Sequence, residues 1–130
     1  MSSDETGSAA LAVIGAVAVV LLLAMWMSAS AIAMRGRQAA TTAADAAALA
    51  AAPVTFLPFG AQGSPSQEAA RFVVMNGAEM IWCRCEIDRT FEPRTVEVRV
   101  RRTVQLPILG TRHVEAIGRA EFVPAALLGS

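Results

Sequence analysis

Cys83 and Cys85, the only two cysteines of the chain, are the residues whose type and spacing most directly suggest chemistry. In an extended strand they would lie on one face, about 6.5–7 Å apart. A disulfide requires Cα atoms about 4.4–6.8 Å apart, so a bond within the pair would be strained or would need a bulge. Two thiolates are too few for structural zinc, which takes about four ligands. We interpret the pair as small apolar core residues, with bonding to another copy or subunit in an oxidising compartment as the alternative.

The other reactive side chains form no catalytic or metal-binding pattern. His113 is the only histidine, and the alternating charges beside it are typical of a solvated strand. Glu86, Asp88 and Glu92 cluster where a strand end and a turn are expected, the usual place for hydrated carboxylates. The sequence holds no glycine-rich phosphate loop and no Gly-x-Ser-x-Gly motif. We therefore expect no enzymatic activity, no metal, no cofactor and no small-molecule substrate.

The charge balance argues against nucleic-acid binding. The chain carries 11 basic residues against 11 acidic ones, and beyond residue 52 the two signs nearly cancel. Because no basic face remains for a phosphate backbone, we expect no nucleic-acid partner.

A long uncharged segment precedes the residues discussed so far. After a polar tail, 1–8, no charged residue occurs between Ala9 and Met34. A helix needs about 20 apolar residues to cross the roughly 30 Å hydrocarbon core, so residues 9–34 predict a transmembrane helix. Trp26 suits the headgroup level, and Arg35 with Arg37 closes the run.

Two other interpretations of this segment are weaker. A buried core helix would need more apolar surface than so short a chain can supply. A cleaved signal peptide could end at Ala29-Ser30-Ala31, which has the small-x-small form of a cleavage site. However, Asp4 and Glu5 stand where a signal peptide is positive, and the run exceeds the usual length of about 7 to 15 residues. We expect an uncleaved anchor.

The segment 35–52 is mostly alanine, the strongest helix former, and no proline occurs before Pro53. It therefore extends the membrane helix, giving one helix over 9–52. Small residues at every fourth position allow another helix to approach closely. We predict that this ridge packs against long helices of other subunits or copies, and a plain spacer is the alternative. The ridge consists of Ala39, Ala43, Ala47 and Ala51.

The remaining chain predicts a small α+β domain over 64–124, between a linker at 53–63 and a tail at 125–130. Ser64 and Pro65 begin a short helix, and Asn76-Gly77 ends it. Alternating segments over 80–88, 95–104 and 113–123 predict a three-stranded antiparallel sheet, with Pro107 and Gly110 in the second turn. The residues expected to face the core are Ile81, Cys83, Cys85, Ile87, Val96, Val98, Val100, Val114, Ala116, Ala120 and Phe122.

Three passages together resemble the TadE/TadG-like proteins of the tight-adherence (Flp) pilus machinery. The first is Arg35-x-Arg37-Gln38 followed by Ala43–Asp45 and Leu49, directly after a membrane helix. The second, EAARFVVMNGAEMIWC, resembles the helix–Asn-Gly–strand–Cys passage of actinobacterial members. The third, VQLPILGTRHVEAIGRAEFVP, resembles the closing segment of the family.

The resemblance implies a pilin-like fold and a minor pilin or pseudopilin that assists assembly of a pilus or related secretion filament. Prepilin-like members are cleaved after a glycine, with Glu at the fifth mature position; Gly7 is the candidate here, and Ala12 stands at that position. The actinobacterial pattern also implies an upstream cysteine that pairs with Cys83; it would fall near Ser66, where this chain has no cysteine. The rival function is a membrane-anchored interaction module that holds together another envelope complex.

The resemblance also implies a location: the bacterial inner membrane, crossed once, with the C-terminal domain outside the cytoplasm. The arginines argue for the opposite orientation. Positive charges favour the cytoplasmic side, and Arg35 and Arg37 follow the membrane run while Asp4 and Glu5 precede it. We expect the extracytoplasmic orientation.

Overall fold

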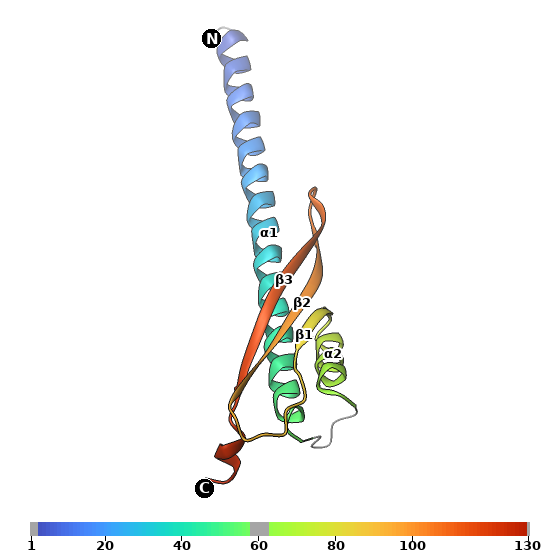
Figure 1. The fold of residues 1–130 in the computed structure, drawn as a ribbon. Coiled ribbons are helices and arrows are strands. Elements are labelled where there is room, and N and C mark those ends of the chain that lie inside the picture. The colour runs from blue at the N-terminus through green and yellow to red at the C-terminus, as the bar shows by residue number, and fades with distance from the viewer. Residues whose placement is uncertain (1–2, 58–62, 130) are drawn as a thin grey trace.

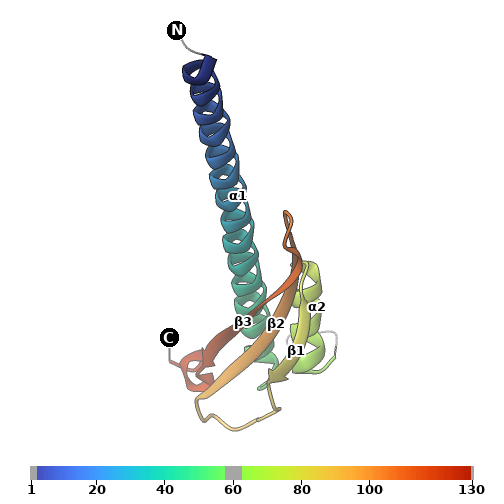
Figure 2. The same ribbon diagram turned by 90° about the horizontal axis from the view of Figure 1, so that it is seen from above.

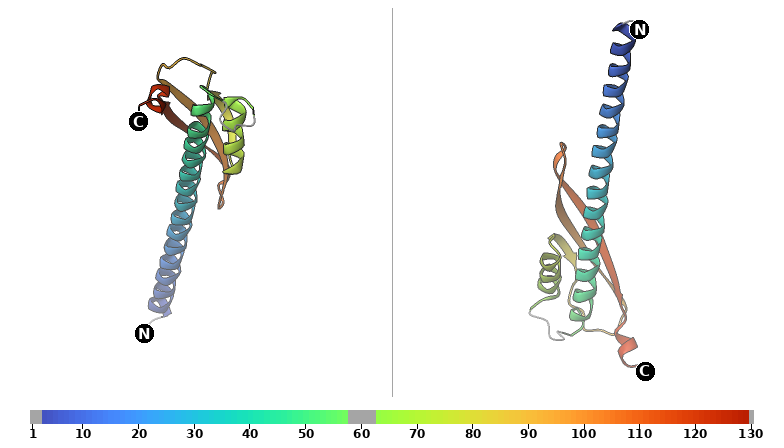
Figure 3. Two further views of the ribbon diagram at one scale, coloured as in Figure 1. Left: turned by 90° about the horizontal axis from the view of Figure 1, so that it is seen from below. Right: turned by 180° about the vertical axis from the view of Figure 1, so that it is seen from behind.

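One helix, α1 (Ser3–Val54), runs through 52 residues and sets the shape of the molecule. The computed structural model describes residues 3–57 and 63–129. The N-terminal half of α1 projects away from a small domain that packs along one side of its C-terminal half (Figure 1). Figure 3 shows the same projection from two further sides. The structure confirms the predicted α+β class.

The many alanines of α1 help to explain its continuity, because alanine is the strongest helix former and only one helix-breaking proline occurs within the helix. The helix begins at Ser3 rather than at the predicted Ala9, and it ends at Val54 rather than Ala52. Pro53 lies inside the last turn and lacks the amide that would donate to the Leu49 carbonyl, and the helix ends one residue later. The turn closes beyond it, since the Leu57 amide donates to the Pro53 carbonyl at 3.0 Å.

The second helix, α2 (Pro65–Met75), has the N-terminus that its sequence predicts. The Gln67 amide donates to Ser64 Oγ at 3.2 Å, and the Ser64 amide donates to Gln67 Oε1 at 2.9 Å. These reciprocal bonds satisfy two amides that the first turn would leave unpaired. Gly77 follows the helix with φ of 71°, the left-handed conformation expected of a stop.

Three antiparallel strands form the sheet, in the order β1-β2-β3. They are β1 (Glu79–Arg84), β2 (Arg94–Leu106) and β3 (Gly110–Phe122). β2 and β3 form a long hairpin that pairs from Arg94↔Phe122 to Leu106↔Gly110. In Figure 2 the sheet is seen beside α1 and α2, and the hairpin tip extends beyond β1.

The core lies between the inner face of the sheet and the two helices. Val96, Val98 and Val100 are buried on β2, as predicted, and α2 adds Ala69 and Val73. The predicted inward residues of β3 also reach this core, either buried or packed against it: Val114, Ala116, Ala120 and Phe122.

The first strand differs from its prediction. β1 ends at Arg84 rather than Asp88, and a bulge lies between Met80 and Trp82. The bulge adds one residue, so Met80 and Cys83 both face the core while Ile81 is 41% exposed. Ile87 lies past the strand and is 60% exposed. The inward placement of Ile81 and Ile87 was therefore wrong.

The predicted linker and tail also contain ordered structure. Within 53–63, residues 58–62 lie outside the described residues, but Val54, Thr55 and Phe56 are buried. The Thr55 carbonyl accepts a hydrogen bond from the Asp88 amide at 2.8 Å. A 3₁₀ helix, η1 (Pro124–Leu127), occupies the start of the predicted tail. The start of the linker therefore packs onto the domain, whereas residues 125–129 of the tail are exposed.

Candidate functional site

Cys83 and Cys85 form a disulfide with each other. Their Cα atoms lie 5.5 Å apart, which is closer than the spacing of a regular strand. The chain achieves this because β1 ends at Arg84, so Cys85 leaves the extended path. The predicted core placement is confirmed, because Cys85 is buried in the core and Cys83 packs against it. The two are bonded to each other, however, rather than left unbonded or paired with another copy.

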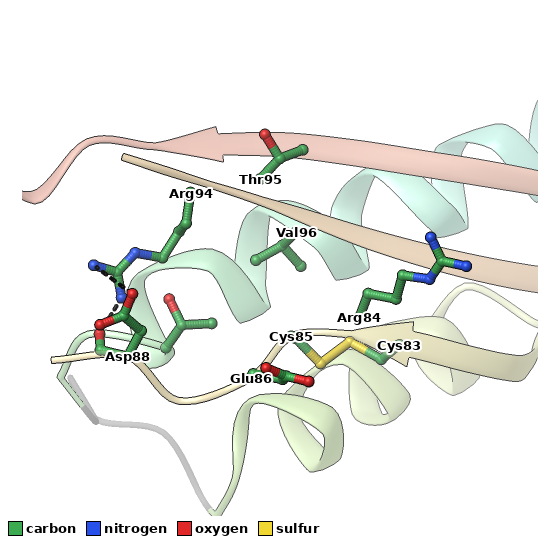
Figure 4. Close-up of a pocket in the computed structure, with 9 residues that line it drawn as sticks. Cys83, Arg84, Cys85, Glu86, Asp88, Arg94, Thr95 and Val96 are labelled. Atoms are coloured by element: carbon green, nitrogen blue, oxygen red, sulfur yellow. Dashed lines mark hydrogen bonds and ion pairs between the residues drawn. A yellow bond between two sulfur atoms is a disulfide. The ribbon is translucent and has the colours of Figure 1, made fainter. Parts of the chain in front are cut away.

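The disulfide borders a cleft of about 470 Å³ at the open end of the sheet (Figure 4). The cleft lies between the segment that follows β1 and the start of β2, with Thr55 from the end of α1 at its base. Its lining residues are Thr55, Cys83, Arg84, Cys85, Glu86, Asp88, Arg94, Thr95 and Val96.

Arg94 is the well-buried cation of this cleft, with 10% of its side chain exposed. Its guanidinium donates to the backbone carbonyls of Asp88, Thr90 and Glu92, the last at 3.0 Å. It also lies 3.8 Å from Asp88 Oδ2 and 5.9 Å from the centre of the Phe56 ring. These bonds use the donors of Arg94 to hold the loop between β1 and β2, so its role is structural.

Asp88 completes this loop from the other side. Its Oδ1 accepts from the Thr90 amide at 2.9 Å. This bond, together with the Thr90 hydroxyl and the charge of Arg94, lowers the pKa of Asp88 below its ordinary value. The carboxylate therefore stays ionised, and its hydrogen bond with the Thr90 amide stabilises the turn.

The exposed residues of the cleft contact the outer face of the sheet. Arg84 stacks on Trp82, with 4.9 Å between the guanidinium carbon and the ring centre, and lies 3.6 Å from Glu97. Arg119 pairs with the same Glu97 at 2.9 Å. Within the described ranges, 3–57 and 63–129, no group of three potential ligands is arranged to hold a metal ion. The chemistry that this cleft offers is the disulfide itself.

His113 lies on the outer part of the hairpin. It is exposed, and its Nδ1 is 3.2 Å from the Thr103 hydroxyl across the strand pair.

The alanine ridge packs inside the molecule. Ala43, Ala47 and Ala51 are fully buried by the chain's own α2 and sheet, and Ala39 is partly buried. The small side chains do permit close packing, but the surface that they meet belongs to the same chain. The prediction that this ridge faces other subunits was therefore wrong.

Two glycines show how closely α1 and the sheet approach. A Cβ added to Gly118 on β3 would lie 2.2 Å from the backbone carbonyl carbon of Ala44. A Cβ on Gly36 would lie 2.5 Å from Val104 Cγ1. The sequence pattern did not predict either contact, although a glycine inside an alternating strand, as at Gly118, often marks a close backbone approach.

The N-terminal half of α1 is the other candidate functional surface. The helix is long and apolar enough to span a membrane, with a mean hydropathy of 2.7 over its most apolar window and none of that window buried. Large apolar side chains are exposed around it, as Val17 at 52%, Leu21 at 59% and Trp26 at 73% show. Gly7 lies exposed within the first turns of α1.

Comparison of the chain with protein-family models, curated proteins and solved structures finds no match. The resemblance to TadE/TadG-like proteins therefore rests on the three sequence passages.

Proposed function

We propose that the chain is a membrane-anchored structural subunit of the minor-pilin or pseudopilin type, without enzymatic activity. The observation that carries the proposal is the division of α1. Its alanine-rich half is buried in the domain, whereas large apolar side chains remain exposed from Leu11 to Met34. A helix that is apolar all round requires lipid or other apolar helices. Pilin-like subunits have the same general shape, a long helix that projects from a small sheet domain.

The projecting half of α1 is the surface that we assign to partner subunits. Small residues recur there at fourfold spacing, as Ala12 with Ala16 and Ala24 with Ser28. The Ser28 hydroxyl donates to the Ala24 carbonyl at 2.9 Å, so its polar atom is satisfied within the helix. Such positions let neighbouring helices, including second copies, approach in a membrane. The sequence passages favour a tight-adherence pilus or a related secretion filament as the assembly.

We place the protein in the inner membrane as a single-pass anchor with its domain outside the cytoplasm. The Cys83–Cys85 disulfide supports this orientation, because disulfides persist in oxidising compartments and are rare in the cytosol. Arg35 and Arg37 favour the reverse orientation, but two arginines are a modest bias.

Photo-crosslinking in native cells tests the proposed function. A photoreactive amino acid replaces Val17 on the projecting half of α1, and the control replaces Ser66, exposed at the start of α2. The proposal predicts that Val17 gives adducts with pilus or secretion subunits, or with the membrane platform that assembles them. Adducts with unrelated envelope proteins would favour the interaction-module alternative. Adducts with lipid alone at Val17 would contradict both functions.

A further inference from the structure

The tip of the β2–β3 hairpin is strongly apolar and exposed. The turn reads Leu106-Pro107-Ile108-Leu109, with Ile108 82% exposed and Leu109 57% exposed. Hairpin turns in water usually carry Gly, Asn or Asp instead. Ile108 also adopts φ of 67°, a left-handed conformation that a β-branched residue disfavours. An exposed apolar residue in an unfavourable conformation indicates a role outside the fold.

The position of the tip relates it to the membrane helix. The hairpin rises alongside α1 beyond the rest of the domain, as Figures 1 and 3 show. An apolar groove of about 430 Å³ separates the tip from α1, and the helix lines it from Leu22 to Ala33, including Trp26. The uncharged run ends at Met34, so a span of about 20 residues placed within it ends between about Ser28 and Met34. The tip therefore lies at the level where the span ends.

We propose that the hairpin tip inserts into the headgroup and upper acyl region of the bilayer as a second membrane contact. The inference rests on the proposed anchoring of α1. Lipid acyl chains would fill the groove beside Trp26, a residue type that favours this depth. The two contacts together would hold the domain in one orientation against the membrane surface.

The charges around the tip suit anionic phospholipid. No acidic residue occurs between Val104 and Val114, or along α1 between Glu5 and Asp45. The exposed charges within these stretches are Arg35, Arg37 and Arg112. Positive side chains just above the hydrocarbon attract phosphate groups, whereas carboxylates would be repelled.

The hairpin is held firmly enough to keep this depth. Val104, which pairs with Arg112 next to the tip, is buried and packs against Gly36 of α1. The Arg102 guanidinium donates to the Asn76 carbonyl at 3.1 Å, which ties the hairpin to the end of α2. Withdrawal of the tip from the membrane would require these contacts to break.

Fluorescence in vesicles tests the proposal with the full-length protein. An environment-sensitive dye is attached at Ile108→Cys, or at Leu109→Cys as a second site, while the native disulfide stays oxidised and unreactive. The protein is reconstituted into phosphatidylcholine–phosphatidylglycerol vesicles that contain a lipid with a shallow spin-label quencher. We expect a blue-shifted emission and strong quenching at both tip sites.

Two control positions make the outcome decisive. Ile117→Cys lies on β3, seven residues beyond Gly110, at an apolar and 44% exposed site, and its dye should remain in water. Leu21→Cys lies within the span of α1, and its dye should be protected from aqueous quenchers. In one outcome, lipid labels deep in the bilayer quench the dye at Leu21, but the dyes at Ile108 and Leu109 give the same emission and quenching as the dye at Ile117. That result would overturn the insertion of the tip and leave the anchoring of α1 intact. A water-exposed dye at Leu21 would instead overturn the anchoring of α1.

Discussion

Replacement of Gly118 by alanine should separate the sheet from α1. A Cβ at this position would lie 2.2 Å from the Ala44 carbonyl carbon, 2.3 Å from its oxygen and 2.5 Å from the Asp45 nitrogen. All three are backbone atoms, so no side-chain rotation can relieve the contact. To reach 3.4 Å, where ordinary contact begins, the helix and the strand must move apart by about 1.2 Å.

The cost of this movement follows from what the two elements share. Buried alanines on α1 face valines on the sheet, and a gap of about 1 Å forfeits a quarter to a half of each van der Waals contact across it. Overpacked cores lose about 1–3 kcal/mol, and a clash against backbone belongs at the upper end. A core in a domain this small supplies about 3–5 kcal/mol, so Gly118→Ala should leave the domain barely folded.

Urea unfolding in detergent micelles measures the effect in a Trp26→Phe background, so that the fluorescence of Trp82 alone reports on the domain. Gly15→Ala is the matched control, because a Cβ on Gly15 has no atom within 4 Å. Gly36→Ala should fall between the two, since the Val104 side chain that it meets can shift. If Gly118→Ala unfolds at the same urea concentration as Gly15→Ala, the close packing of the alanine-rich helix on the sheet is refuted.

Three further predictions concern the cleft and the hairpin. Arg94→Ala should destabilise the domain by about 1–3 kcal/mol in urea unfolding, because three backbone carbonyls lose a charged donor; Arg84→Ala, at an exposed side chain, should cost no more than about 0.5 kcal/mol, and equal losses would contradict the role of Arg94. Since the pKa of Asp88 is lowered in the folded state, its contribution is present above the ordinary value of about 3.9 and is lost as pH falls through the lowered pKa. Asp88→Asn should flatten that acid decline in a urea series at several pH values, and an unchanged decline would refute the assignment. Ile108→Gly should be more stable in detergent than Ile108→Ala by about 0.5–1 kcal/mol, because both lack the apolar side chain and only glycine adopts the left-handed conformation without strain; equal stabilities would contradict the strain at this position.

Local patterns in the sequence predicted most of the elements. The uncharged run and the alanines predicted one continuous helix, and Ser64 with Gln67 predicted the start of α2. Alternation along 95–104 predicted the buried valines of β2. These features depend on neighbouring residues only, so a single sequence carries them.

The errors arose where distant parts of the chain meet. The alanine-rich segment would show the same sequence pattern whether it packs against another subunit or against its own sheet. The close contact between Gly118 and α1 shows that it packs against its own sheet. The bulge at Ile81 adds one residue to β1, so the side chains on its two sides no longer alternate in register with each other. A regular alternating pattern in the sequence does not reveal such an insertion. The disulfide depends on where β1 ends, which also follows from pairing with β2.

Labelling of α1 in intact cells tests the central claim, an anchor in the membrane with its domain outside the cytoplasm. Leu49→Cys lies on the face of α1 opposite the buried alanines and is 66% exposed, whereas Leu21→Cys lies in the span. The native cysteines are bonded to each other and leave the introduced thiol as the reactive one. With a membrane-impermeant maleimide, the account predicts modification at Leu49→Cys and protection at Leu21→Cys until detergent is added. Protection of Leu49→Cys until the membrane is permeabilised would place the domain in the cytoplasm, and modification of Leu21→Cys in intact cells would show that α1 does not span the membrane.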